Sequence, residues 1–254
     1  MIAPGQFAHR RIPPDPALAG SVEHFWWVRW DLDDGPPQRR ETLPHPSVHW
    51  VFETGQTRLL GLSRQRFVRV LEGRGQVFGV KFLPGGFRPL LGAAVSTLTG
   101  RALAPTVLWG PSVSAPVAAV EAAADAEQAI AQVAPFLKAR LAGLPADPWV
   151  ARISQLVHAA QHDHTLLRAE QLAAHAGLGL RQLQRLFDQY VGLGPKWVLQ
   201  RYRLHEVLAR LDAGQPAPDW SQLSLDLGWF DQAHFIRDFR RLTGVTPAHY
   251  VRRP

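Results

Sequence analysis

Two short groups of arginine, glutamine and histidine side chains stand out in the C-terminal third of the sequence. They are Arg181, Gln182, Gln184 and Arg185 in the first group, and Gln232, His234, Arg237 and Arg240 in the second. An arginine can bridge O6 and N7 of guanine, and a glutamine can bridge N6 and N7 of adenine. These residue types therefore suit hydrogen bonding to base edges, provided that the surrounding structure turns them outward.

Apolar residues at helical spacing accompany each group. They are Leu183, Leu186 and Phe187 in the first, and Phe235, Phe239 and Leu242 in the second. This spacing predicts two amphipathic helices, over residues 180–191 and 231–242, with the polar side chains on the face away from the core. Ala233 and Ile236 also fall on the outward face of the second helix, where Ile236 can touch a thymine methyl group.

Each predicted helix follows a shorter one and a tight turn, as in a helix-turn-helix. The turns are at Gly177 and Gly228, which are 51 positions apart. Four further positions repeat 52 residues later with the same residue type: Arg185, Phe187, Gly192 and Pro195 reappear as Arg237, Phe239, Gly244 and Pro247. The sequence therefore contains two copies of one unit, with one more residue in the second turn.

The second copy, LGWFDQAHFIRDFRRLTGVTPAHY, resembles the signature of the AraC/XylS family of bacterial transcription regulators. The resemblance covers about residues 149–253. It implies that the second helix of each unit reads the major groove of double-stranded DNA. It maps most directly onto Arg181, Gln184, Arg185, Gln232, His234 and Arg237. Since most relatives activate transcription, it also implies an activator that recruits RNA polymerase.

Residues 195–213 form a predicted helix between the two units. Trp197, Leu204, Leu208 and Leu211 line one face of it. Its length of about 28 Å is comparable with the roughly 34 Å of one DNA turn, so one chain can read an asymmetric site of about two turns. Phosphate contacts are expected from helix N-termini and from basic residues, namely Lys196, Arg201 or Arg203, Arg240, Arg241, Arg252 and Arg253.

The first 110 residues favour strands and turns. Short segments rich in β-branched and aromatic residues alternate with Pro/Gly clusters, at 22–30, 47–52, 58–62, 66–71 and 76–82. Their spacing predicts a small antiparallel barrel or sandwich. The stretch GVKFLPGGFRPLLG, followed by LWG, resembles the sensor-like N-terminal domains attached to some regulators of the same family.

The alanine-rich stretch 114–141 predicts one or two helices, with Pro135 at a break or a start. These helices can form a dimerisation surface, or they can pack back on the β domain. The expected fold class is α+β with three parts: a β-rich sensor or oligomerisation domain at 1–110, a helical linker at 111–147 and an all-α DNA-binding domain at 148–254. The last part holds helices expected at about 149–161, 168–176, 180–191, 195–213, 220–227, 231–242 and 247–252.

Composition limits the alternatives. The chain has 254 residues, a formal charge of +7 and no cysteine, which excludes disulfides and thiolate metal sites. The charge suits a polyanionic partner, although it is spread over both halves. With 25 arginines against three lysines, the sequence indicates a GC-rich bacterial genome. No run of eighteen apolar residues and no signal-peptide pattern occurs, so we expect a cytoplasmic protein with no membrane segment.

The histidines of the chain and the aromatic residues of its first half suggest no catalytic motif. The eleven histidines lack metal-ligand spacing, and no nucleophile elbow, P-loop or dinucleotide fingerprint is present. We therefore expect no metal, no cofactor and no enzyme activity. The aromatic residues of 24–27 and 49–50 can line a pocket for a small-molecule effector or can simply form strand core. The alternatives for the N-terminal domain are an enzyme or metabolite carrier, and a purely structural module that forms a homodimer.

Overall fold

The computed structural model describes residues 6–32, 35–213 and 217–251. Its strands are β1 (Gln6–Ile12), β2 (Val22–Asp31), β3 (Gln38–Thr42), β4 (His49–Phe52), β5 (Arg58–Leu60), β6 (Phe67–Leu71), β7 (Arg74–Phe82) and β8 (Ala102–Leu103). Six of them form an antiparallel sheet in the order β1-β2-β7-β4-β5-β8, and β3 pairs with β6 in a separate two-stranded ribbon. The β-rich N-terminal domain expected from the sequence is confirmed.

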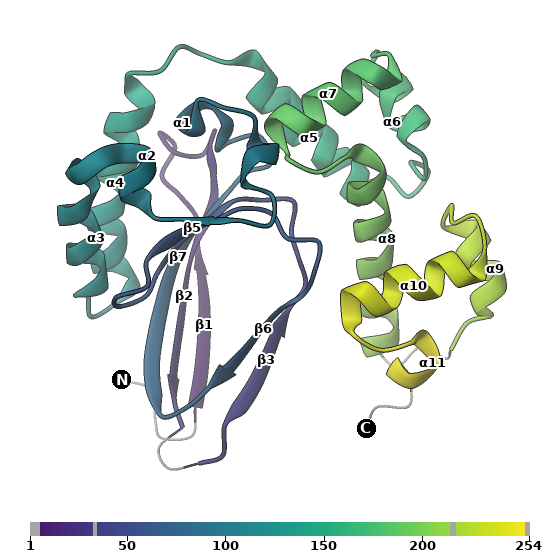
Figure 1. Ribbon diagram of the computed structural model, residues 1–254, viewed down its shortest axis with the longest axis horizontal. Helices are drawn as coiled ribbons and strands as arrows, with labels where there is room; N and C mark the ends of the chain where they lie inside the picture. Colours follow the sequence, from purple (N-terminus) through teal and green to yellow (C-terminus); the bar gives the residue numbers. More distant parts are fainter. Residues whose placement is uncertain (1–5, 33–34, 214–216, 252–254) are drawn as a thin grey trace.

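The two faces of the six-stranded sheet bury different residues. One row, Phe25, Val80 and Trp50, is fully buried beneath helices α3 (Ser114–Glu121) and α4 (Ala126–Ala142). The opposite face points toward the β3–β6 ribbon (Figure 1). Indole rings of Trp26 and Trp30 lie on this second face against Gly79 and Gly75, where an added Cβ would come within 2.2 Å of each ring. Glycine is therefore required at these two strand positions because the rings occupy the side-chain space.

Helices α3 and α4 differ from the sequence expectation at Pro135, and they show where the alanine-rich segment packs. Pro135 neither breaks nor begins a helix, because it lies inside the continuous helix α4. Its side chain is exposed, so the carbonyl that loses its helical partner faces water. The buried side of α4, with Val133 and Leu137, packs into the core of the β domain. Of the two alternatives for this segment, the structure therefore has the helices folded back on the sheet.

Four short helices join the sheet to these longer ones. They are α1 (Arg88–Leu91), the 3-10 helix η1 (Val95–Leu98), α2 (Pro105–Trp109) and the 3-10 helix η2 (Gly110–Val113). Trp109 packs against Trp50 with ring centroids 4.7 Å apart, and Phe136 of α4 joins the same aromatic group. This group links the strands to the helical layer.

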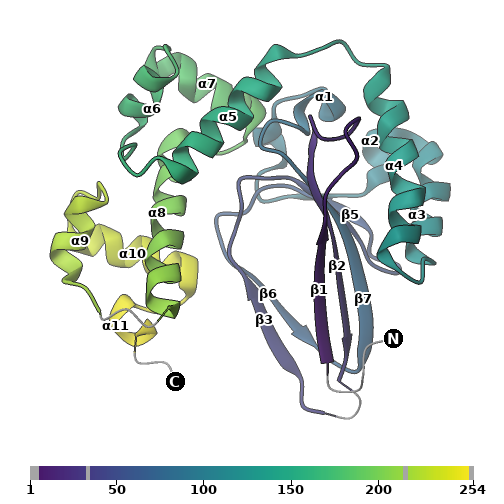
Figure 2. The same cartoon turned by 180° about the vertical axis from the view of Figure 1, so that it is seen from behind.

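The C-terminal region is helical, as expected. Its helices are α5 (Pro148–His162), α6 (Ala169–His175), α7 (Leu180–Tyr190), α8 (Pro195–Asp212), α9 (Trp220–Asp226), α10 (Gln232–Thr243) and α11 (Pro247–Tyr250). Pro148, Pro195 and Pro247 each begin a helix, where the missing N–H has no cost. Helix α8 connects the two helix-turn-helix units (Figure 2).

The two units have separate hydrophobic cores. Helices α5 to α7 and the first half of α8 belong to one continuous cluster with the β domain, which includes Phe187, Val191 and Leu199. The second half of α8 forms a smaller cluster with α9, α10 and α11, centred on Phe235 and Phe239. Helix α8 therefore packs on both units, as its apolar face predicted.

Candidate nucleic-acid interface

Helix α7 is the second helix of the first unit, and its sequence divides cleanly between buried and exposed residues. Leu183 and Phe187 have no exposed surface. The four predicted base-reading residues, Arg181, Gln182, Gln184 and Arg185, are all exposed on the opposite side. The turn before the helix uses Gly177 at φ +65°, a left-handed conformation that favours glycine. The first unit thus presents the predicted polar face.

Helix α10 occupies the same place in the second unit. Its N-cap is Asp231, whose carboxylate accepts a hydrogen bond from the His234 backbone N–H at 2.6 Å. Gly228 forms the preceding turn at φ +83°. Phe235 and Phe239 are fully buried, whereas Gln232, Arg237 and Arg240 are exposed. Phe235 and Phe239 occupy the positions of Leu183 and Phe187 in α7.

Two residues of α10 are less free than the sequence suggested. Ile236 is half-buried against the second hydrophobic cluster, so it does not face outward fully. The ring of His234 is also half-buried, with Nε2 at 3.3 Å from the Asp238 carboxylate. The same carboxylate oxygen accepts a hydrogen bond from the Trp229 indole at 3.0 Å. Contact between His234 and a base would therefore compete with this internal pair.

The predicted phosphate contacts need one clear correction. Lys196, Arg240 and Arg241 are exposed, but Arg201 and Arg203 are buried, with exposed fractions of 2% and 1%. Arg203 donates to the backbone carbonyls of Ala160 and Asp163 at 2.9 and 2.8 Å. Arg201 and Arg203 therefore serve the protein interior and cannot reach DNA phosphates in this conformation. Arg252 and Arg253 lie outside the described residues.

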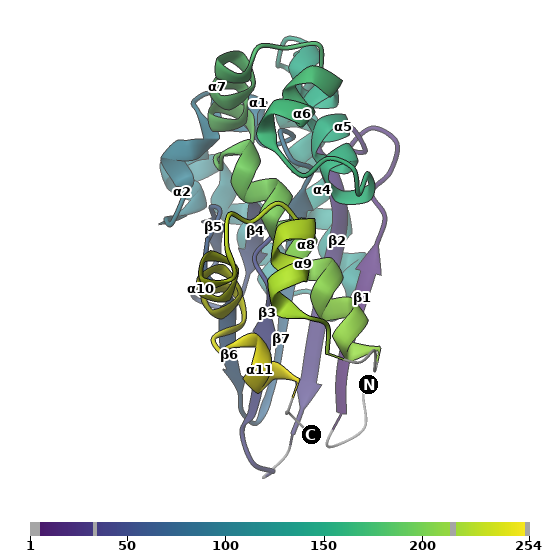
Figure 3. The ribbon, with the colours of Figure 1, turned by 90° about the vertical axis from the view of Figure 1, so that its right-hand side faces the viewer.

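Helices α7 and α10 lie on the same side of α8, one above the other in Figure 3. Helix α8 has 18 residues, a length of about 27 Å at a rise of about 1.5 Å per residue. The length of α8 is close to the length of about 28 Å expected from the sequence for the helix between the two units.

The first unit is anchored to the N-terminal domain by contacts at the C-terminal end of α7. Thr99 Oγ1 of the N-terminal domain donates to the Gly192 carbonyl at 2.7 Å. Within the helical region, the Tyr190 hydroxyl donates to Oδ2 of Asp147, the N-cap of α5, at 2.7 Å. Burial and the Asp147 carboxylate raise the pKa of Tyr190 to about 12. Gly192 sits so close to Leu62 and Val95 that an added Cβ would be 3.0 Å from each.

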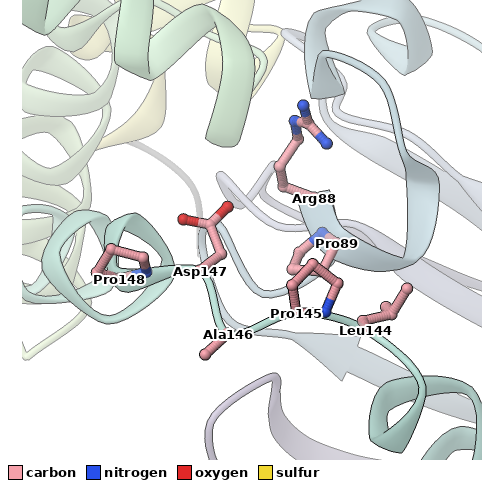
Figure 4. Close-up of a pocket in the computed structure, with 7 residues that line it drawn as sticks. All are labelled: Arg88, Pro89, Leu144, Pro145, Ala146, Asp147 and Pro148. Carbon is pink, nitrogen blue, oxygen red and sulfur yellow. The ribbon is translucent and has the colours of Figure 1, made fainter.

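A cavity of about 290 Å³ opens at this junction (Figure 4). Its lining residues come from α1, the segment before α5 and the start of α5: Arg88, Pro89, Leu144, Pro145, Ala146, Asp147 and Pro148. The Asp147 carboxylate is already bonded to Tyr190 and to the Trp149 backbone N–H at 3.0 Å. The cavity therefore marks the seam between the β domain and the first unit.

The described residues contain no group of three or more histidine, cysteine or acidic side chains arranged to hold a metal ion. Within the same residues, no helix has the length and apolar character needed to cross a membrane.

A chain with two helix-turn-helix units, each presenting an exposed Arg/Gln face, has the architecture of a DNA-binding transcription regulator. Residues 172–253 match the helix-turn-helix domain family, and residues 10–104 match a domain family of unknown function, DUF6597. The match to the helix-turn-helix domain supports an AraC-type regulator, as the signature in the second unit indicated.

The chain is also similar to several solved structures. An AraC-type regulator from Chromobacterium violaceum is 25% identical, over 38% of this chain and 87% of that one, with a TM-score of 0.32. The C-terminal domain of AraT, a response regulator from Geobacillus stearothermophilus, is 23% identical over 42% of this chain and 85% of that one, with a TM-score of 0.33. ToxT from Vibrio cholerae, solved with an unsaturated fatty acid bound, is 11% identical over 99% of this chain and 97% of that one, with a TM-score of 0.38. No curated protein matches the chain.

Proposed function

We propose that the protein reads two successive major grooves of a promoter with α7 and α10, and that a single chain suffices for an asymmetric site of about two turns. The observation that carries this proposal is the pair of exposed faces on α7 and α10, displayed on one side of α8. Arg185 and Arg237 occupy equivalent positions in the two faces and are the strongest candidates for guanine contacts.

The remaining predicted contacts complete each half of the interface. In the first half, Arg181, Gln182 and Gln184 read bases while Lys196 at the start of α8 binds phosphate. In the second half, Gln232 and Arg237 read bases, Arg240 and Arg241 bind phosphate, and His234 contributes after releasing Asp238. Phosphate contacts fix the position of the helices, and the base contacts give specificity.

The proposal extends to domain roles and partners. Residues 1–110 sense a small-molecule effector, 111–147 connect, and 148–254 bind DNA. The hydrophobic cluster shared by the first two parts and the first unit gives a route from effector to DNA. As the family resemblance implies, the bound protein recruits RNA polymerase and activates transcription in the cytoplasm. A promoter–reporter assay in a cell with and without the gene tests activation, since repression would give the opposite sign.

Selection of bound sequences from a random pool of double-stranded DNA tests the reading function directly. We expect a bipartite, non-palindromic motif whose two parts are separated by about 10–10.5 base pairs. Affinity for the selected site should fall steeply with salt, by about 0.9 log units per log unit of salt for each phosphate contact. A motif confined to one groove would contradict the two-reader proposal.

A further inference from the structure

A group of basic side chains gathers where the six-stranded sheet meets helix α8. We call it the basic cluster, and it consists of Arg11, His24, Lys81 and His49 from the sheet, His45 from the β3–β4 loop, and Arg201 and His205 from α8. The strand register aligns His24, Lys81 and His49 in one row. The rings of His45 and His205 lie 5.8 Å apart and join the loop to the helix.

The basic cluster has little negative charge to balance it. Among the described residues, Glu23 is the carboxylate recorded within ion-pair distance, at 2.8 Å from Lys81 Nζ and 3.4 Å from His24 Nδ1. Burial lowers the pKa of Lys81, and the neighbouring charges of Arg11 and Arg201 lower it further. Burial likewise lowers the pKa of Arg201 to about 9. Lys81 therefore has the Glu23 carboxylate as its partner, whereas no carboxylate within ion-pair distance of Arg201 is recorded among the described residues.

The lack of a balancing negative charge is clearest at Arg201. Its side chain is buried, and its Nε donates to the Pro44 carbonyl. Its two terminal nitrogens, Nη1 and Nη2, are buried and find no acceptor among the described residues. The same is true of Trp26 Nε1 and His205 Nε2. Buried polar groups without partners are rare, because each one loses its hydrogen bonds to water without replacement.

An apolar surface borders the basic cluster on the sheet. Trp26 pairs with Arg11 across strands β1 and β2. The centroid of its indole ring lies 6.3 Å from the centroid of the His49 imidazole ring. Trp26, Val28 and Val51 are half-buried and pack together with the cluster of Trp30 and Leu71 beneath the β3–β6 ribbon. A ligand with both an anionic group and an apolar part would match both surfaces.

We propose that the basic cluster binds the carboxylate of a small organic acid, held by Arg201 and Lys81, with its apolar part against Trp26. The planar guanidinium can bind a carboxylate through both terminal nitrogens, which are the atoms without partners. Since Arg201 lies in the helix that carries both reading units, the ligand would bridge the sheet and α8. The inference rests on the proposed function, because it names the class of effector.

The test uses the full-length protein and two probes with the same apolar part, 3-phenylpropionate and the uncharged 3-phenylpropan-1-ol, with acetate and inorganic phosphate as small anions. Wild-type protein should gain about 5–10 °C in Tm when 3-phenylpropionate is about 100-fold above its dissociation constant. The alcohol, acetate and phosphate should bind at least tenfold more weakly.

Arg201→Met is the decisive variant, because it removes the charge and keeps a long apolar side chain. The variant should bind 3-phenylpropionate at least tenfold more weakly, without a lower Tm in the absence of ligand, since an uncompensated buried cation has been removed. Arg210→Gln, at an exposed position on the same helix, serves as the control and should bind the acid like wild type.

Three results would overturn the inference: no binding of 3-phenylpropionate by wild type, equal binding of the alcohol or of phosphate, or equal binding by Arg201→Met. If Arg201→Met does not fold, Lys81→Met replaces it, with the same expected loss of binding. Affinity for the selected DNA site is measured on every variant without ligand. Retained DNA binding together with no acid binding would reject the effector site and leave the DNA-reading proposal intact.

Discussion

The two helix-turn-helix units share one sequence pattern, yet they are attached to the rest of the molecule in different ways. The first unit is part of the main hydrophobic core, which runs from the β domain through Phe187 to the first half of α8. The second unit has its own small core around Phe239. Its recorded polar contact with the β domain is a hydrogen bond from Arg66 to the Thr243 carbonyl at 2.7 Å. A duplicated unit can therefore have one fixed copy and one that is more loosely held.

This difference suggests how a signal would reach DNA. The spacing between α7 and α10 depends on α8. Because the second unit packs on the C-terminal half of α8, its position depends on the orientation of that half. Arg201, near the middle of α8, contacts the β3–β4 loop through the Pro44 carbonyl. A change at that contact would move the second reading helix while leaving the first in place.

The largest effect is expected from truncating the equivalent buried phenylalanines. Phe187→Ala and Phe239→Ala should each cost about 3–5 kcal/mol of local stability, because each leaves a cavity in a packed core. Hydrogen exchange separates them: Phe187→Ala should accelerate exchange in β2 and β7 as well as in α7. Phe239→Ala should accelerate exchange only in α9, α10 and α11. Equal acceleration in the sheet would show that the two cores are not separate.

Removing the equivalent arginines should have the next largest effect. Arg185→Ala and Arg237→Ala should each weaken binding to the preferred DNA site by about 1–3 kcal/mol, since each removes a two-point contact to a base. Their losses should add approximately, because the two sites are far apart. Thermal denaturation of the variants serves as the control for folding. A variant that folds and binds like wild type would remove that residue from the interface.

Acidification should weaken the junction between the β domain and α8. Burial lowers the pKa of His45 to about 2 and that of His49 to about 3, with Lys81 adding to both shifts. The unfolded chain takes up protons on these histidines near pH 6.5, and the folded chain does not. The contribution of the two neutral histidines to the free energy of unfolding is therefore fully present above pH 6.5 and is lost as the pH falls below it. Each histidine contributes up to about 1.4 kcal/mol per pH unit.

Melting curves between pH 7.5 and pH 5 measure this loss. His45→Gln and His49→Gln should each flatten the pH dependence, because glutamine does not titrate. His249→Gln, at an exposed position in the second unit, should leave it unchanged. If all three variants keep the wild-type dependence of Tm on pH, the acid sensitivity arises from other groups.

The smallest effect is expected at the contact that holds the second unit. Arg66→Ala should cost about 0.5–1.5 kcal/mol, the usual net contribution of a hydrogen bond. Hydrogen exchange should increase near the end of α10 and in α11, but not in α7. Arg64→Ala, at an exposed neighbouring position, provides the comparison. Unchanged exchange in α10 would show that Arg66 does not hold the unit.

The sequence predicted the helical half well because its signals are local. Helix starts at proline, turn glycines and apolar spacing all lie within one unit, so each helix could be recognised without knowing its neighbours. The order of burial along α7 and α10 followed directly from the same spacing. The sequence also predicted the β domain, although strands β1, β3 and β8 were missed. The segments QFAHRRI of β1 and QRRET of β3 become strands through pairing with β2 and β6.

Residues whose roles depend on distant partners could not be predicted. Arg201 and Arg203 were expected to face phosphate, because charged residues on a helix usually face solvent. Their acceptors, Pro44, Ala160 and Asp163, lie 40 to 157 positions away in the sequence. The basic cluster was missed for the same reason, since it assembles from four strands of the sheet (β1, β2, β4 and β7), a loop and a helix.

Methylation protection of guanine N7 on the selected DNA site tests the central claim most directly, because an arginine that bridges O6 and N7 shields that nitrogen. Two protected patches are expected, with centres about 10–10.5 base pairs apart on one face of the duplex. Arg185→Ala should abolish protection in one patch, and Arg237→Ala should abolish it in the other. A single protected patch, or loss of the same patch in both variants, would contradict the account.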